Sequence, residues 1–166
     1  MIVLMGVSGS GKTTVGRLLA HDLNWKFYEG DDFHPPANRK KMSEGQALND
    51  ADREPWLSAL RNTIADSLGR KENAVVSCSA LGQAYRDRLA MDGVRFVYLK
   101  GDYELIAARL ERRTGHFFAP GLLASQFAIL EEPRAALIVD IGRGPRAVAE
   151  EIAQRLGLEG GADHDA

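Results

Sequence analysis

The sequence predicts an α/β fold in which one domain carries a five-stranded parallel sheet with helices on both faces and a helical lid. Five short apolar runs alternate with segments whose apolar residues recur at helical spacing, as in a parallel sheet with crossover helices. A glycine-rich stretch joins the first run to the first helical segment. The 166 residues, of which 45% are hydrophobic and 27% charged, suit a single globular domain.

The glycine-rich stretch, residues 6–13 (GVSGSGKT), has the full context of a phosphate-binding loop: strand, turn, Lys-Thr and helix. Glycines let backbone N–H groups turn inward around phosphate oxygens, and the helix N-terminus adds partial positive charge. Lys12 is placed to reach the outer phosphates, and the Thr13 hydroxyl to bind Mg²⁺. The alternative is a ligand-free glycine-rich turn. We expect a nucleoside triphosphate, held by Gly6, Ser8, Gly9, Ser10, Gly11, Lys12, Thr13 and Thr14.

The first half of the chain continues with a second strand at residues 25–29. Two prolines, Pro35 and Pro36, suit the first turn of a helix that runs to about Ser43 and ends at Gly45. Asn49 then caps a long helix, and its apolar stripe is expected in the core: Trp56, Leu57, Leu60, Ile64 and Leu68.

The second half begins with residues 74–78, an uninterrupted β-rich run typical of a strand covered on both faces. A basic helix follows, then a strand at 94–99 and a helix from Asp102 through Arg113. The last elements are a helix at 122–130, a strand at 137–141 and a closing helix from Pro145. The domain is expected to span residues 1–158, and the tail 159–166 to be disordered.

Polar residues or glycines follow each strand after the first. In open parallel sheets, ligands bind beyond the carboxyl ends of the strands. Asp31 follows the second strand, Ser79 the third, Gly101 the fourth and Gly142 the fifth. We therefore expect these distant segments to converge on the phosphate loop.

Composition excludes several classes of function. A net charge of −2 gives no electrostatic case for binding nucleic acid or an anionic membrane. The single cysteine, Cys78, excludes an internal disulfide and suits a reducing compartment. No apolar run approaches the ~20 residues that span a bilayer, and the first strand starts at residue 2, which leaves no room for a leader peptide. We expect a cytoplasmic protein.

The nucleotide site resembles neither a switch nor a motor. The Asn-Lys-x-Asp guanine reader is absent, and the third strand lacks the terminal aspartate with which motor ATPases hold Mg²⁺. The nearest suitable carboxylate is Asp31, which could orient Mg²⁺ through water or accept a proton from an attacking hydroxyl. One of the pair Asp31 and Asp32 could instead cap the following helix, and we favour Asp31 for the chemistry.

The segment of about residues 109–131 is expected to form the lid. Phosphoryl transfer needs cations around the moving group and exclusion of water. Arg109 and Arg113 lie one turn apart and could grip one phosphate chain, and Arg112 lies near that face. The alternative is a solvated basic helix. A glycine- and aromatic-rich loop, residues 114–121, follows this helix.

The other polar residues expected at this edge suit an acceptor. His34, Asn38 and Lys41 share one helical face. Many donors and few aromatic rings favour a small, hydroxyl-rich anion over a nucleobase. The expected acceptor site comprises Asp31, His34, Asn38, Lys41, Arg53, Ser79, Tyr85, Arg86, His116 and Gln126.

With these motifs in place, the chain resembles the small bacterial-type gluconate kinases, which are shikimate-kinase-like members of the nucleoside-monophosphate-kinase superfamily. The resemblance spans about residues 2–156. Beyond the phosphate loop it includes Glu-Gly-Asp at 29–31 with His34-Pro35, Ser-Cys-Ser-Ala-Leu at 77–81 with Tyr-Arg-Asp at 85–87, and Gly-His-Phe at 115–117. Ala47 and Gly82 depart from the family's usual proline and lysine, and Gly82 removes a cation near the acceptor edge.

The resemblance implies phosphorylation of D-gluconate at its 6-hydroxyl by ATP with Mg²⁺, in a homodimer. It assigns Lys12, Thr13, Arg109 and Arg113 to catalysis, phosphates and Mg²⁺, and either Arg53 or Arg86 to the gluconate carboxylate. The alternatives are shikimate kinase, another kinase of carboxylated polyols, or an ATP-binding module without an acceptor. A nucleoside-monophosphate kinase fits less well, because the acceptor motifs offer nothing to stack a base.

Overall fold

The computed structural model describes residues 1–112 and 120–158. Its sheet has five strands, all parallel, in the order β2-β3-β1-β4-β5. The strands are β1 (Ile2–Met5), β2 (Lys26–Glu29), β3 (Ala74–Ser77), β4 (Arg95–Lys100) and β5 (Leu137–Asp140). The predicted fold class is confirmed. No strand end differs from the prediction by more than one residue.

Seven α-helices connect and cover the strands within the described residues. They are α1 (Lys12–Asp22), α2 (Pro36–Ser43), α3 (Asp50–Gly69), α4 (Gln83–Leu89), α5 (Tyr103–Glu111), α6 (Pro120–Ile129) and α7 (Pro145–Arg155). A single 3₁₀ turn, η1 (Gly30–Phe33), was not predicted, because its four residues carry no periodic pattern.

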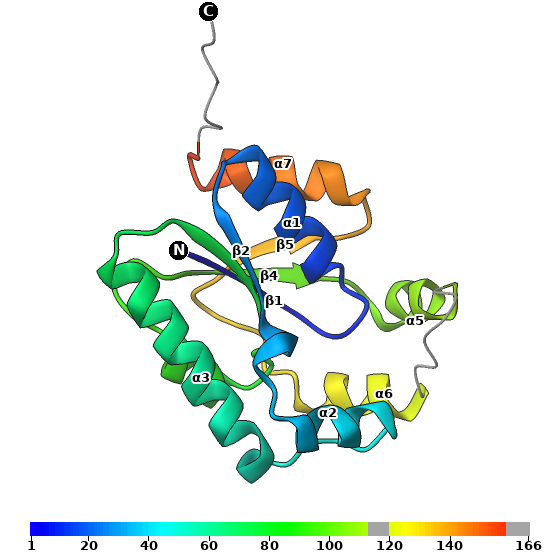
Figure 1. Cartoon of the computed structure of the whole chain (residues 1–166). Helices are drawn as coiled ribbons and strands as arrows, with labels where there is room; N and C mark the ends of the chain where they lie inside the picture. Colours follow the sequence, from blue (N-terminus) through cyan, green and yellow to red (C-terminus); the bar gives the residue numbers. More distant parts are fainter. Residues whose placement is uncertain (113–119, 159–166) are drawn as a thin grey trace, which may run out of the picture.

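The central strand β1 shows why helices cover both faces. Its side chains alternate: Ile2 and Leu4 lie in one core, Val3 and Met5 in the other. In Figure 1, α1 and α7 lie over one face and α3 over the opposite face. All four residues of β1 are buried, which explains a continuous apolar run in place of alternation with polar residues.

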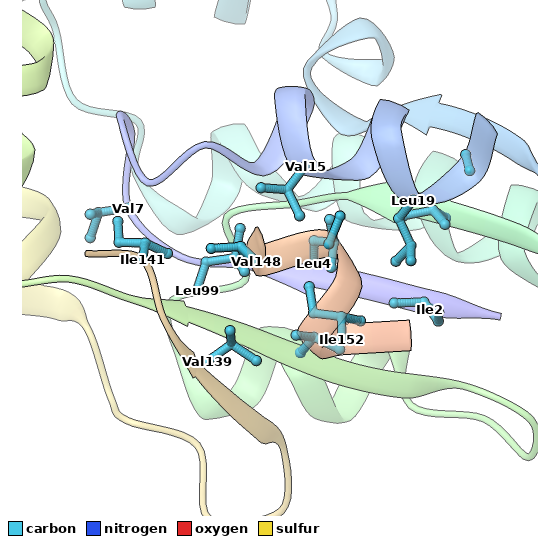
Figure 2. Packing of buried hydrophobic residues seen from close by; sticks show 14 of the residues in the cluster. Ile2, Leu4, Val7, Val15, Leu19, Leu99, Val139, Ile141, Val148 and Ile152 are labelled. Atoms are coloured by element: carbon cyan, nitrogen blue, oxygen red, sulfur yellow. The ribbon is translucent and has the colours of Figure 1, made fainter. Parts of the chain in front are cut away.

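The first core fills the space between the sheet, α1 and α7. Figure 2 shows Val15 and Leu19 of α1 and Val148 and Ile152 of α7 directed toward Leu4 of the sheet. The second core packs α3 and α4 on the other face through the residues Trp56, Leu57, Leu60, Ile64 and Leu89. The expectation that Trp56 belongs to the core is confirmed.

Side-chain caps fix the starts of two helices. The Asn49 side chain accepts from Asp52 N, and the Asp52 side chain accepts from Asn49 N, which forms a reciprocal capping box for α3. Asp102 accepts from Leu105 N at the start of α5. Helix α5 ends at Glu111, two residues before the expected end at Arg113. Arg113, the loop with His116 and the tail 159–166 fall outside the described residues. In the described part, no helix is long and apolar enough to cross a membrane.

Candidate active site

The phosphate loop links β1 to α1 at the carboxyl edge of the sheet. Gly9 and Gly11 have φ angles of 83° and 94°, in the region that favours glycine. Lys12 folds back over the loop, and its Nζ donates to Gly6 O at 3.0 Å and Val7 O at 2.9 Å. Ser10 Oγ is buried without a hydrogen-bond partner in the described structure. The hydrogen bonds of Lys12 within the loop are therefore made to backbone carbonyls.

A cavity of about 350 Å³ opens beside this loop. That volume is within the usual range of small-molecule sites. Arg109 and Arg143 also line this cavity, and Arg109 Nη2 donates to Ile141 O. Asp31 and Thr13 line the same space, so the convergence predicted from the strand ends holds for Asp31. The lining residues are Ser8, Gly9, Ser10, Gly11, Lys12, Thr13, Thr14, Val15, Asp31, Arg109, Leu110, Ile141, Arg143, Pro145 and Val148.

Asp31 is exposed, but the backbone just before it is held from two sides. Gly30 N donates to Ser77 Oγ at 3.1 Å, and Trp56 Nε1 donates to Gly30 O at 2.8 Å. A Cβ at residue 30 would lie 2.0 Å from Ser77 O, so only glycine permits this approach of β2 to β3. Strand β3 and helix α3 thus fix the direction in which Asp31 leaves the sheet.

His34 is buried against helix α3. Its ring stacks on the Trp56 indole with centroids 4.4 Å apart and an angle of 11°. Only 6% of the residue is exposed. Burial, with the nearby charges of Arg39 and Arg53, lowers the pKa of His34 to about 4. The imidazole is therefore neutral near pH 7.

The other two residues of the predicted polar face also contact α3. Asn38 Nδ2 donates to Asp52 O at 2.6 Å and lies 3.5 Å from His34 Nδ1. Lys41 Nζ is 2.7 Å from Asp52 Oδ1 and remains partly exposed. All three side chains lie on the side of α3, although His34 precedes α2 and so does not share a helical face with the other two. The inner part of this set joins α2 to α3, and Lys41 at its outer end is open to solvent.

Arg53, Tyr85 and Asp50 form a cluster where α3 meets α4. Arg53 Nη1 donates to Tyr85 Oη at 3.0 Å and Asp50 Oδ1 at 3.2 Å, and Tyr85 Oη donates to Asp50 Oδ1. Burial and the Asp50 carboxylate raise the pKa of Tyr85. The Arg53 charge of this cluster also contributes to the lowered pKa of His34.

Arg86 differs from its expected role. It is 3% exposed, and its Nη1 donates to Ala80 O and Leu81 O at 2.9 Å each. Its Nη2 donates to Gln83 Oε1 and Glu131 O at 2.8 Å each. Ala80 has a φ of 41°, unusual for a residue with a side chain, so Arg86 braces a strained turn. The expected contact of Arg86 with the acceptor finds no support in this arrangement.

The remaining predicted residues divide into two groups. Ser79 is half-buried next to the loop, and its carbonyl accepts from Gly6 N at 3.2 Å. Gln126 reaches the loop from α6 and bonds Ser8. Arg113 and His116 lie outside the described residues.

The contacts of Ser77 and Trp56 that position Gly30 were not predicted from the sequence. A serine inside an apolar strand was a signal for the first of them.

A phosphate loop and a cavity that Lys12, Thr13 and Asp31 line together define a P-loop kinase of small molecules. The chain matches the shikimate kinase family over residues 8–156. It is 44% identical to the gluconokinase of Gluconobacter oxydans (strain 621H), over 95% of this chain and 92% of that one. It is 46% identical to the thermoresistant gluconokinase of Escherichia coli (strain K12), over 84% and 83%. The chain belongs to the gluconokinase family.

Solved structures agree with this assignment. A gluconokinase from Sinorhizobium meliloti 1021 superposes with a TM-score of 0.82 at 42% identity, over 94% of each chain. A sugar kinase from Janibacter sp. HTCC2649 gives 0.87 at 38% identity, over 95% of this chain and 94% of that one. A shikimate kinase from Acinetobacter baumannii gives 0.63 at 21% identity, over 93% and 91%, and so shares the fold.

Proposed function

We propose that this protein transfers the γ-phosphoryl group of ATP to the 6-hydroxyl of D-gluconate, giving 6-phospho-D-gluconate and ADP. The observation that carries the proposal is the position of Asp31, which lines the same cavity as Lys12 and Thr13 in a chain of the gluconokinase family. A carboxylate beside the phosphate loop is what an attacking hydroxyl requires.

The nucleotide half of the reaction is electrostatic. Backbone N–H groups of the loop and the N-terminus of α1 would bind the β- and γ-phosphates, with Lys12 on the transferred group. Arg109 lines the same cavity as the loop and would neutralise charge that develops during transfer. Arg113, which lies outside the described residues, is proposed for the same task. Arg143 and Pro145 extend the cavity toward the expected place of the adenine.

Mg²⁺ fits the donor set of this cavity. The described residues hold no cluster of three His, Cys, Asp or Glu side chains. The Thr13 hydroxyl and the Asp31 carboxylate offer oxygens, which Mg²⁺ prefers, and phosphates complete such sites. When bound, the ion would neutralise phosphate charge. Asp31 would accept the proton of the attacking hydroxyl.

The acceptor would lie where α2, α3 and α4 contact one another, on the side of these contacts that is open to solvent. Arg53 is the proposed ligand of the gluconate carboxylate, because a guanidinium can hold a carboxylate through two parallel bonds. Lys41, Ser79, Tyr85 and the neutral His34 would bind hydroxyls, with Asn38 holding His34 in place. His116 remains a proposed ligand from the lid.

One observation favours a second candidate, because the family match over residues 8–156 carries the description of shikimate kinase. A coupled assay of ADP release with gluconate, shikimate and related sugar acids separates the two. We expect turnover with gluconate well above that with shikimate. Higher turnover with shikimate would overturn the proposal, and ATP hydrolysis unaffected by every acid would indicate an ATP-binding module.

We also propose a homodimer in the cytoplasm. The homodimer is proposed because the family resemblance implies one. The cytoplasm is proposed because the single cysteine, Cys78, is buried and unpaired. Burial raises the pKa of Cys78 to about 12, so its thiol stays protonated. Light scattering of the purified protein would test the dimer, and a monomeric mass at micromolar concentration would contradict it.

A further inference from the structure

Helix α6 reaches the phosphate loop through one side chain. Ser8 N donates to Gln126 Oε1 at 2.7 Å, and Gln126 Nε2 donates to Ser8 Oγ at 3.0 Å. Both ends of the carboxamide therefore bond the same residue, 118 positions away in the sequence. A side chain of α6 thus accepts a hydrogen bond from an N–H of the loop.

The two partners are held by their own surroundings. On α6, Leu123 is buried in the first core, and the Phe127 ring contacts Tyr103 of α5 with centroids 5.4 Å apart. On the loop, the residue after Ser8 is Gly9, where a Cβ would lie 2.9 Å from Leu110 Cγ. Gln126 thus connects a packed helix to a loop that is itself pressed against α5.

The contact bears on how the loop binds phosphate. A glycine-rich loop loses more conformational entropy on ordering than other segments, so contacts that order it in advance favour binding. The Ser8 N–H has its acceptor in this side chain. An amide that accepts from this N–H and donates to the same residue's hydroxyl fixes the peptide plane at Ser8.

We propose that Gln126 is a positioning residue for the phosphate loop, which orders Ser8 for ATP, and that it is not a ligand of the sugar acid. This replaces the expectation that Gln126 binds the acceptor. It rests on the proposed function only in taking ATP as the phosphoryl donor. α6 thereby supports the nucleotide half of the site from the acceptor side.

The test is the affinity for a non-hydrolysable ATP analogue, measured by calorimetry without any sugar acid. Gln126→Met keeps the length and helix preference of the side chain but removes both hydrogen bonds. We expect the dissociation constant to rise about tenfold, because the loop must then be ordered when the nucleotide binds. Ser8→Ala keeps its N–H and removes one bond, so a rise of about threefold is expected.

The double variant decides whether the two side chains act together. If Gln126 acts through Ser8, adding Ser8→Ala to Gln126→Met changes the dissociation constant by less than a further 1.5-fold. The control is Ser125→Ala, on the same helix, whose hydroxyl bonds only Leu122 O within α6. It should stay within twofold of the wild type.

Three results would overturn the proposal. The first is unchanged analogue affinity in Gln126→Met, and the second is full multiplication of the two single effects. The third, from steady-state kinetics, is a raised KM for gluconate in Gln126→Met with the KM for ATP unaltered. Because the binding measurement uses no sugar acid, it remains decisive even if gluconate proves to be the wrong acceptor.

Discussion

Asp31 has a defined direction although its side chain is exposed. The preceding carbonyl and N–H are bonded by Trp56 of α3 and Ser77 of β3. A base must lie within hydrogen-bond reach of the hydroxyl that it deprotonates, so fixed backbone is as important as carboxylate chemistry. The carboxylate itself keeps its freedom to approach substrate.

The first prediction concerns this carboxylate. Asp31→Asn keeps the size of the side chain and removes the base, so we expect kcat to fall about 10²–10⁴-fold. Affinity for the ATP analogue in the absence of Mg²⁺ should change little. The measurements are steady-state kinetics and calorimetry. Turnover near the wild-type value would remove Asp31 from the role of base.

A second prediction concerns the buried ring of His34. Its pKa of about 4 in the folded protein lies below the value of about 6.5 in the unfolded chain, so between these values the unfolded state binds the extra proton. The resulting stabilisation is complete above about pH 6.5 and is lost as the pH falls toward 4. The measurement is the free energy of unfolding in urea from pH 4 to 7. His34→Asn, which does not titrate, should show a flatter profile, and equal slopes would contradict the explanation.

At the scale of elements, the 3₁₀ turn η1 is the joint between the sheet and the acceptor helices. It begins at Gly30, directly after β2, where an added Cβ would meet Ser77 O of β3, and it leads through His34 into α2. The stacked pair of His34 and Trp56 then sets α2 against α3. A small change at this joint should therefore shift both the base and the acceptor face.

The third prediction tests that joint. In Gly30→Ala the added Cβ would meet Ser77 O at 2.0 Å, and backbone must move to relieve the contact. We expect the free energy of unfolding to fall by about 1–3 kcal/mol, with a lower kcat. The matched control is Gly69→Ala in the last turn of α3, where a Cβ meets nothing within 4 Å. The control should be neutral or stabilising by up to about 1 kcal/mol. Equal effects of the two substitutions would refute the steric argument.

The helices and strands could be predicted from the sequence more completely than the contacts of the site. The strands, the phosphate loop and the caps at Asn49 and Asp102 depend on neighbouring residues, and local patterns record them. The inward direction of Arg86 depends on the carbonyls of a turn whose positive φ at Ala80 no local rule announces. The contact of Gln126 with Ser8 joins residues 118 positions apart, and only packing of α6 brings them together.

On the scale of the whole molecule, ATP should stabilise the fold because the cavity is assembled from the phosphate loop, α1, α5 and the segment that leads into α7. At a concentration one hundred times the dissociation constant, binding adds about 2.7 kcal/mol. For a domain of this size, that corresponds to a rise in Tm of about 5–10 °C. Calorimetry with and without ATP is the measurement. The variant Lys12→Ala should show a much smaller rise, and an unchanged wild-type Tm would speak against the assigned cavity.

The two hydrophobic cores on either side of the sheet also support different halves of the proposed site. The core of α1, α5 and α7 supplies Val15, Leu110, Ile141 and Val148 to the nucleotide cavity. The core of α3 and α4 carries Trp56 and supports the arginine, tyrosine and histidine of the acceptor side. Substitutions on one face of the sheet can thus alter the choice of acceptor while the other face keeps its packing. Such a chain can diversify in the molecule it phosphorylates and still retain one way of holding ATP.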